Sequence, residues 1–195
     1  MTLADKITSL RIILAPLFFI IYLAPVFFPA LPVNGSGWTV PVLWALFIVS
    51  QITDMIDGMV ARGRKEVSDF GKLFDPFADT LAQITFFLCF VIDGLLPVVL
   101  YLAVLYREFC ILFMRNLMLR KGIAMGARIG GKIKTVVYIL AEIAALLAAS
   151  VNRLDFAVFL FPFFKTSALI IFILSVILSI ISFFDYLSVY KGKTT

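Results

Sequence analysis

Six apolar segments, each long enough to cross a lipid bilayer, make up most of this chain. They lie near residues 6–29, 38–62, 72–93, 95–119, 132–150 and 166–189. About 20 apolar helical residues span the hydrocarbon core of a bilayer. With 63% hydrophobic residues and a mean hydropathy of +1.09, the chain cannot be a water-soluble monomer. The sequence therefore predicts an all-α integral membrane bundle of six transmembrane helices, forming a single domain over residues 1–195.

The segments between the apolar spans alternate in charge. Loops on one side carry Asp93, Arg153, Asp155 and Lys165, whereas the other side is strongly basic. The positive-inside rule therefore predicts that both termini and the acidic residues face the cytoplasm. We expect the chain to lie in the cell inner (plasma) membrane. The basic residues of that side are Lys6, Arg11, Arg62, Arg64, Lys65, Lys72, Arg120, Lys121, Arg128, Lys191 and Lys193.

The net charge of +5 does not indicate nucleic-acid binding, because the basic residues lie in short loops between apolar spans. Anionic membrane lipids and phosphorylated substrates are the expected partners.

Four carboxylates lie close together at the basic side, between Asp54 and Asp79. The stretch reads DMIDGMVARGRKEVSDFGKLFDPFAD. Ionisable groups at the membrane are costly and usually mark a functional site. The chain has no histidine, so a metal bound here would have only oxygen ligands, as Mg²⁺ and Mn²⁺ prefer. The stretch therefore predicts a site for one or two divalent ions.

The spacing within this stretch places the acids on two helix faces. Asp54 and Asp57 are three residues apart, and Asp75 and Asp79 are four apart. Residues at these spacings lie on the same face of a helix, about one turn apart. Two such pairs facing each other would form an oxygen cage for divalent ions.

Small residues and one arginine lie between the two acidic pairs. Gly58 and Ala61 leave room for a bulky ligand to approach the helix backbone. Arg62 offers a guanidinium that suits phosphate oxygens. A metal site, a phosphate contact and a narrow slot together indicate phosphoryl transfer.

These residues form the pattern D-x-x-D-G-x-x-A-R-x8-G-x-x-x-D-x-x-x-D, which resembles the signature of the CDP-alcohol phosphotransferase family at every fixed position. The resemblance implies a homodimeric membrane enzyme with an active site on the cytoplasmic side. Such an enzyme transfers a phosphatidyl group from CDP-diacylglycerol to an alcohol and releases CMP. The resemblance implies that two Mg²⁺ or Mn²⁺ ions are bound per site by Asp54, Asp57, Asp75 and Asp79. It implies that Asp79 also acts as the general base. The residues implied to bind CDP are Thr8, Gly58, Ala61, Arg62 and Gly71.

A second group of basic residues predicts the acceptor. They fall in and after the fourth apolar segment, and a pocket so charged suits an acceptor that already carries a phosphate. The surrounding residues, together with Ile7-Thr8 and Arg11-Ile12, resemble bacterial phosphatidylglycerophosphate synthases, which implies glycerol 3-phosphate as acceptor. Inositol phosphate and serine are the alternatives. The predicted acceptor-phosphate residues are Arg107, Arg115, Lys132 and Lys134.

Two questions stay open at this stage. The charged residues Arg107, Glu108 and Glu142 fall inside apolar segments. The first question is whether they bind substrate or only pair with one another and hold helices together. A transporter that uses the acids to pass a divalent cation is the alternative from a different class. Transporters usually place such groups near the membrane midplane, whereas these acids lie at one end.

Overall fold

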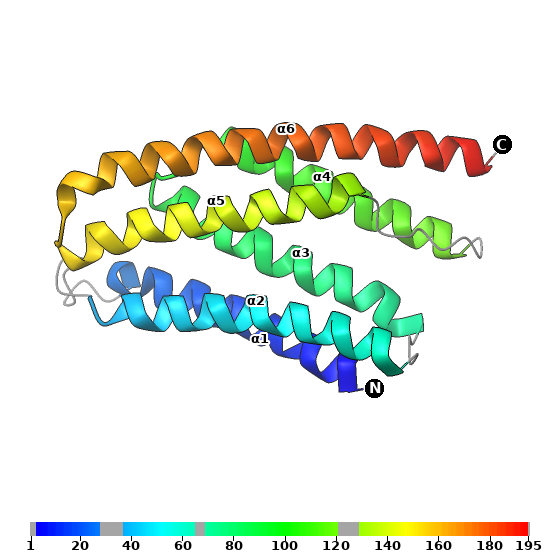
Figure 1. Ribbon diagram of the computed structural model, residues 1–195, viewed down its shortest axis with the longest axis horizontal. Coiled ribbons are helices and arrows are strands. Elements are labelled where there is room, and N and C mark those ends of the chain that lie inside the picture. Colours follow the sequence, from blue (N-terminus) through cyan, green and yellow to red (C-terminus); the bar gives the residue numbers. More distant parts are fainter. Residues whose placement is uncertain (1–2, 28–36, 65–68, 121–128, 195) are drawn as a thin grey trace.

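The computed structural model describes residues 3–27, 37–64, 69–120 and 129–194, which form an all-helical bundle (Figure 1). The predicted all-α class is confirmed, and no strand occurs in these ranges. A short 3₁₀ turn, η2, which the sequence did not predict, precedes the last helix. The helices are α1 (Leu3–Phe27), α2 (Thr39–Arg64), α3 (Asp69–Ile92), α4 (Val98–Arg120), α5 (Ile129–Leu154), η2 (Val158–Leu160) and α6 (Phe161–Thr194).

Five of these six long helices are apolar enough along their length to cross a membrane: α1, α2, α3, α5 and α6. The exception within the described ranges is α4. Its 23 residues would rise about 34 Å, which is enough for a span. However, it carries Arg107, Glu108 and Arg115 among its apolar residues. These three charged residues line the cavity described below.

Both chain termini lie at one end of the bundle, where α2 ends and α3 begins (Figure 1). The N-terminal end of α5 and the C-terminal end of α4 lie at this end too. The C-terminal end of α2 and the N-terminal end of α3 therefore lie at the same end of the bundle as the described ends of α1, α4, α5 and α6 that flank basic segments.

Aromatic residues fill the core between the first three helices. Phe18 of α1 packs edge-on against Phe86 of α3, with ring centroids 4.6 Å apart. Phe47 of α2 lies 5.5 Å from the same Phe86 ring. All three side chains are almost completely buried. The outward faces remain apolar, for example at Ile13 and Phe113, as expected for helices in contact with lipid.

Small residues allow α5 and α6 to pack closely along most of their length (Figure 1). At Gly130 and Gly131 an added Cβ would already be in van der Waals contact with Ser182 and Tyr186 of α6. Alanines further along α5 are fully buried. Small residues at such interfaces let helix backbones approach within a membrane. This packing brings α6 side chains up to the site described below.

A buried arginine joins three helices at the end of the bundle away from the termini. Arg153 donates hydrogen bonds to the Tyr22 carbonyl at 2.9 Å and to Thr39 Oγ1 at 3.2 Å. The Tyr22 hydroxyl in turn donates to Asp93 at 2.7 Å. The sequence placed Arg153 among loop charges, whereas the structure buries it in the last turn of α5.

Candidate functional site

The acids of α2 and α3 converge on two polar residues of α1. Arg11 NH1 lies 2.8 Å from Asp54 Oδ1 and also contacts Asp79 Oδ1. One turn earlier, the Thr8 hydroxyl donates to Asp75 Oδ1 at 2.8 Å. Thr8 and Arg11 are almost completely buried, while Asp54 and Asp79 keep close to half of their side-chain surface exposed. The carboxylates are therefore held from behind by α1 and remain accessible in front.

Part of the predicted nucleotide site cannot be placed. Asp57, Gly58, Ala61 and Arg62 belong to the last turns of α2, but their side chains lie outside the described residues. Gly71 is buried in the first turn of α3, on the helix that carries Asp75. Their predicted roles stay predictions.

The described donors suit a hard divalent ion in chemistry, since they are carboxylate and hydroxyl oxygens. Among the described side chains, no group of three acids closes around a common point. Instead, Asp54 and Asp79 share one nitrogen of Arg11. Two carboxylates from different helices thus approach within reach of a single cation, and these residues would be suited to hold a divalent metal.

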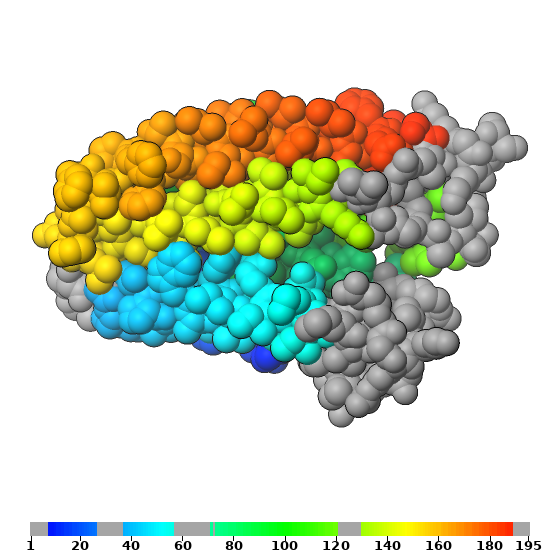
Figure 2. Space-filling model, in the orientation of Figure 1, coloured from blue at the N-terminus to red at the C-terminus, as the bar shows by residue number. Residues whose placement is uncertain are grey.

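A cavity of about 210 Å³ extends from these acids into the bundle, and all six long helices contribute to its walls. Figure 2 shows α3 recessed between α2 and α5 near the end where the chain termini lie. The polar and charged residues that line the cavity are Arg11, Ser50, Gln51, Asp54, Asp79, Thr80, Gln83, Arg107, Glu108, Arg115, Lys132, Lys134, Thr135 and Tyr186.

The charge of this cavity is unevenly distributed. Five basic side chains and three carboxylates line it. Asp54 and Asp79 lie on the wall formed by α2 and α3, whereas four of the five basic residues come from α4 and α5. The excess of positive charge on one wall favours an anionic ligand, and the acids on the other wall favour a metal.

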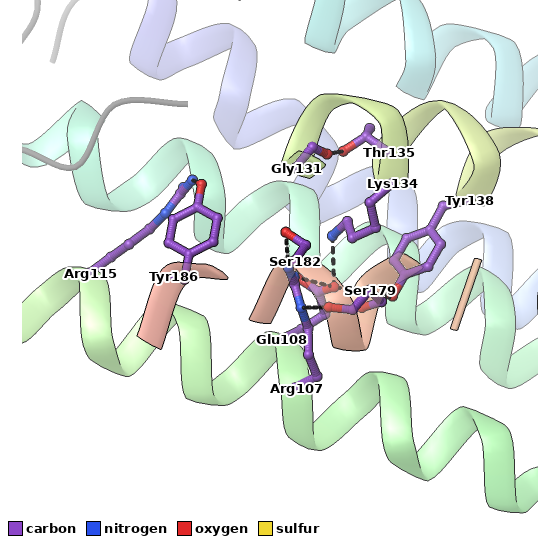
Figure 3. A network of polar contacts seen from close by, with 10 residues as sticks. All are labelled: Arg107, Glu108, Arg115, Gly131, Lys134, Thr135, Tyr138, Ser179, Ser182 and Tyr186. Atoms are coloured by element: carbon purple, nitrogen blue, oxygen red, sulfur yellow. Dashed lines mark hydrogen bonds and ion pairs between the residues drawn. The ribbon is translucent and has the colours of Figure 1, made fainter. Parts of the chain in front are cut away.

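Glu108 organises the basic wall (Figure 3). Its Oε1 atom accepts hydrogen bonds from Arg107 NH1 at 2.9 Å and from Lys134 Nζ at 2.7 Å. The Tyr138 hydroxyl lies 3.3 Å from the same oxygen, and Lys134 lies 4.5 Å from the centre of the Tyr138 ring. Glu108, Arg107 and Lys134 are all buried. One carboxylate therefore holds two cations from different helices at the cavity.

Hydroxyl groups and a backbone carbonyl of α6 complete this wall (Figure 3). Arg107 Nε donates to the Ser179 carbonyl at 3.1 Å, and its NH2 donates to Ser182 Oγ at 3.2 Å. Arg115 NH2 donates to the Tyr186 hydroxyl at 3.2 Å, with the guanidinium 5.7 Å from that ring centre. The arginines of α4 are thus fixed in direction by α6.

All four residues predicted for the acceptor phosphate line the cavity that Asp54 and Asp79 also line. They are not equivalent: Arg107 and Lys134 are buried and bonded to Glu108, whereas Lys132 is exposed. The open question about Arg107 and Glu108 is answered in part, since they pair with each other and also line the cavity. Glu142 does not take part: both of its carboxylate oxygens lack a hydrogen-bond partner among the described residues.

The sequence did not assign site roles to several residues that the structure brings to the cavity. Arg11 was read as a basic residue near the N-terminus and as part of the resemblance to the synthases, without a role in the site, and Gln51, Gln83 and Tyr186 were not considered. The signal for Arg11 was present, because it lies three residues, about one helical turn, after Thr8. Nothing in the sequence identified Tyr186, because its part in the site depends on how α6 packs.

Comparison with known proteins places this geometry in a family. The sequence profile described as CDP-alcohol phosphatidyltransferase matches residues 1–186. The chain is 37% identical to the CDP-diacylglycerol–glycerol-3-phosphate 3-phosphatidyltransferase of Treponema pallidum, over 97% of this chain and 89% of that protein. It is also 37% identical to the Bacillus subtilis protein of the same name, over 83% of this chain and 82% of that protein.

A more distant relative carries a different name. The CMP-forming cardiolipin synthase of Streptomyces coelicolor is 30% identical over 63% of this chain and 54% of that protein. The Treponema pallidum and Bacillus subtilis relatives, which cover more of this chain, are both named for glycerol 3-phosphate.

Proposed function

Because this chain belongs to the CDP-alcohol phosphatidyltransferase family, we propose that it transfers the phosphatidyl group of CDP-diacylglycerol to the hydroxyl of glycerol 3-phosphate. The products are phosphatidylglycerophosphate and CMP. The chain is a phospholipid-synthesising transferase of the membrane. The observation that carries the acceptor assignment is that one cavity has both an acidic wall and a facing wall with four basic residues.

The acidic wall is proposed to hold the pyrophosphate of the donor. Asp54, Asp57, Asp75 and Asp79 would hold one or two Mg²⁺ or Mn²⁺ ions, which when bound would neutralise charge on the pyrophosphate and on the departing CMP. Thr8 fixes the direction of Asp75, and Arg11 fixes Asp54 and Asp79.

Transfer requires one bond to form and one to break at the β-phosphorus. The acceptor hydroxyl oxygen forms the new P–O bond as Asp79 takes its proton. The bond between the β-phosphorus and the bridging oxygen breaks, and CMP leaves with that oxygen. Asp79 suits the role of base because its side chain is part-exposed to the cavity, opposite the basic wall.

The basic wall is proposed to hold the phosphate of the acceptor. Arg115, Lys132 and Lys134 present cations to the cavity, while Arg107 and Glu108 keep Lys134 and the wall in position. A phosphate placed here would leave the hydroxyl of a short acceptor directed toward Asp79. Serine lacks the phosphate that this wall is built to bind.

The membrane setting follows from the same residues. We propose that α4 also spans the bilayer, with Arg107, Glu108 and Arg115 turned inward to the cavity and α6. Both termini and the site would face the cytoplasm of the inner membrane. A homodimer is proposed from the family resemblance.

A conservative change at Arg11 is expected to have a moderate effect. In Arg11→Lys a single ammonium cannot hold Asp54 and Asp79 as the guanidinium does, so kcat/KM for CMP release should fall about tenfold. The concentration of Mg²⁺ required for half-maximal rate should rise in parallel.

Arg153→Lys is the matched control, because Arg153 is equally buried and lies at the other end of the bundle. It should lower thermal stability without changing kcat/KM of the folded enzyme. Equal losses of kcat/KM in both variants would contradict a role for Arg11 in the site.

An acceptor panel tests the proposed function. Purified protein in detergent receives CDP-diacylglycerol, Mg²⁺ or Mn²⁺, and one acceptor: glycerol 3-phosphate, inositol phosphate, serine or phosphatidylglycerol. CMP release is expected with glycerol 3-phosphate, and it should stop when a chelator removes the metal. Release with a different acceptor would retain the family chemistry and overturn the acceptor assignment. Absence of release in every arm would contradict the function.

A further inference from the structure

The inner part of the polar cavity is lined by two uncharged amides. Gln51 of α2 and Gln83 of α3 both line the cavity, and both side chains are half-buried. Gln51 lies three residues before Asp54, on the same face of α2. Gln83 lies four residues after Asp79, on the same face of α3. Because α2 runs toward the end of the bundle that holds the termini and α3 runs away from it, both amides lie about one helical turn deeper than the acids (Figure 1).

The aromatic core closes the cavity beneath these amides. Phe86, three residues after Gln83, is the deepest residue of α3 that lines the cavity. Its ring packs against Phe18 and Phe47, and all three aromatic side chains are almost completely buried. A ligand that extends inward past the acids therefore meets the amides before it meets the core.

Neither amide is occupied by the protein itself. The side chains of Gln51 and Gln83 make no hydrogen bond to another residue in the described parts of the chain. By contrast, the Thr85 hydroxyl, two residues further along α3, donates to the Leu81 carbonyl at 2.7 Å. A primary amide offers two N–H donors and one carbonyl acceptor, and polar groups inside a protein are normally paired. The two glutamines therefore have donors and acceptors available for a ligand in the cavity.

The direction of transfer places the acceptor on this inner side of the acids. The stretch proposed to bind the nucleotide, Gly58 to Arg62, follows Asp54 on α2 and so lies toward the end of the bundle that holds the termini. In phosphoryl transfer the attacking and leaving oxygens lie roughly in line on opposite sides of the phosphorus. CMP that leaves toward the termini therefore requires an acceptor that attacks from the inner side, where the amides are.

We propose that Gln51 and Gln83 bind the hydroxyl at C2 of the glycerol acceptor and make the enzyme prefer acceptors that carry it. This inference rests on the proposed function, since it assigns a further contact to the acceptor at the same site. The basic wall takes the phosphate on C3 and Asp79 takes the proton of the hydroxyl on C1, so the C2 hydroxyl lies between them. An amide both donates to and accepts from a hydroxyl, which a cation or a carboxylate alone does not do. The two glutamines are thus specificity-determining residues and transfer no proton.

An acceptor without the C2 hydroxyl tests the proposal. The compound 3-hydroxypropyl phosphate keeps the phosphate and the attacking primary hydroxyl of glycerol 3-phosphate and lacks only that group. The value of kcat/KM for each acceptor is measured from CMP release at saturating CDP-diacylglycerol and Mg²⁺. Wild-type protein should prefer glycerol 3-phosphate at least about tenfold, as expected when polar groups of a site lose their partner.

Gln51→Leu and Gln83→Leu should each lower this preference to about threefold or less, because leucine has nearly the volume of glutamine but no donor or acceptor. The loss should fall on kcat/KM for glycerol 3-phosphate, while kcat/KM for 3-hydroxypropyl phosphate stays close to the wild-type value. Thr85→Val is the matched control, because it removes a hydroxyl from the same helix at a position that does not line the cavity. It should leave the preference unchanged.

The outcomes separate the amide contact from the function. A wild-type protein that uses both acceptors equally would overturn the contact without any substitution, while the transferase activity stands. Glutamine variants that keep the wild-type preference, including variants whose two rates fall equally, would overturn it too. A wild-type protein that releases no CMP with either acceptor would overturn the proposed function itself. A preference that both leucine variants lose and Thr85→Val keeps supports the contact.

Discussion

Replacing Asp79 by asparagine is expected to lower CMP release by about a thousandfold. A positioned base contributes about 10²–10⁴-fold to such reactions, and asparagine cannot accept the proton of the attacking hydroxyl. Asparagine also removes one negative charge from the proposed metal ligands, which weakens the binding of a hard divalent ion. The measurement is the rate of CMP release at saturating CDP-diacylglycerol and glycerol 3-phosphate, with Mg²⁺ raised until the rate no longer increases.

Asp155→Asn is the matched control for this substitution. Asp155 is exposed and lies between α5 and η2 with φ of 49°, a conformation that asparagine also adopts readily. This control should release CMP at the wild-type rate. If Asp79→Asn retained more than about a tenth of the wild-type rate, far above the expected range for a lost base, Asp79 would not be the base.

Replacing Glu108 by glutamine is expected to have the second-largest effect, on both stability and acceptor binding. Arg107 and Lys134 would lose the one carboxylate oxygen that they share, leaving two buried cations around a neutral amide. Breaking a buried ion pair in this way costs about 3–5 kcal/mol of stability. Because Lys134 would no longer be held at the cavity, the KM for glycerol 3-phosphate should also rise at least about tenfold.

Thermal unfolding in detergent and acceptor kinetics are measured together for Glu108→Gln. The control is Glu142→Gln, since Glu142 is equally buried but bonds to none of the described residues. That control should leave the KM for glycerol 3-phosphate unchanged. A Glu108→Gln protein that unfolds at lower temperature but keeps the wild-type KM for glycerol 3-phosphate would restrict Glu108 to holding helices together.

The sequence predicted the helices well because lipid imposes a simple rule. An apolar stretch of membrane length must satisfy its backbone hydrogen bonds internally, so segments such as 38–62 become helices whatever their neighbours do. The boundaries were less accurate. The fourth helix begins at Val98, and α6 extends from Phe161 to Thr194, well beyond the predicted 166–189. Pro162 does not delay α6, because proline is tolerated in the first turn of a helix.

The candidate site could be predicted only where chemistry and local spacing carry the signal. Asp54, Asp75 and Asp79 are recognisable because acids at helical spacing are rare in an apolar chain. The partners that orient them come from elsewhere: Arg11 from α1, and Ser179, Ser182 and Tyr186 from α6. Which serine or tyrosine of an apolar helix meets an arginine depends on helix rotation and packing.

The partners of Glu108 likewise could not be predicted from the sequence. From the sequence, Arg107, Glu108 and Glu142 were possible partners for one another. The structure places Lys134 at 2.7 Å from Glu108 and leaves Glu142 outside the network, although Tyr138, one turn before Glu142 on α5, contacts Glu108. If α5 were rotated about its axis by one residue, a different side chain of α5 would face Glu108.

The most direct measurement of the central claim is the stoichiometry of transfer. Glycerol 3-phosphate carrying ¹⁴C in its glycerol is incubated with CDP-diacylglycerol, Mg²⁺ and purified protein, and CMP and chloroform-extractable ¹⁴C are counted in the same samples. The account predicts one labelled glycerol in the lipid fraction for each CMP released, with both absent in Asp79→Asn. CMP released without label in the lipid fraction, or metal transport across liposomes with no CMP at all, would contradict it.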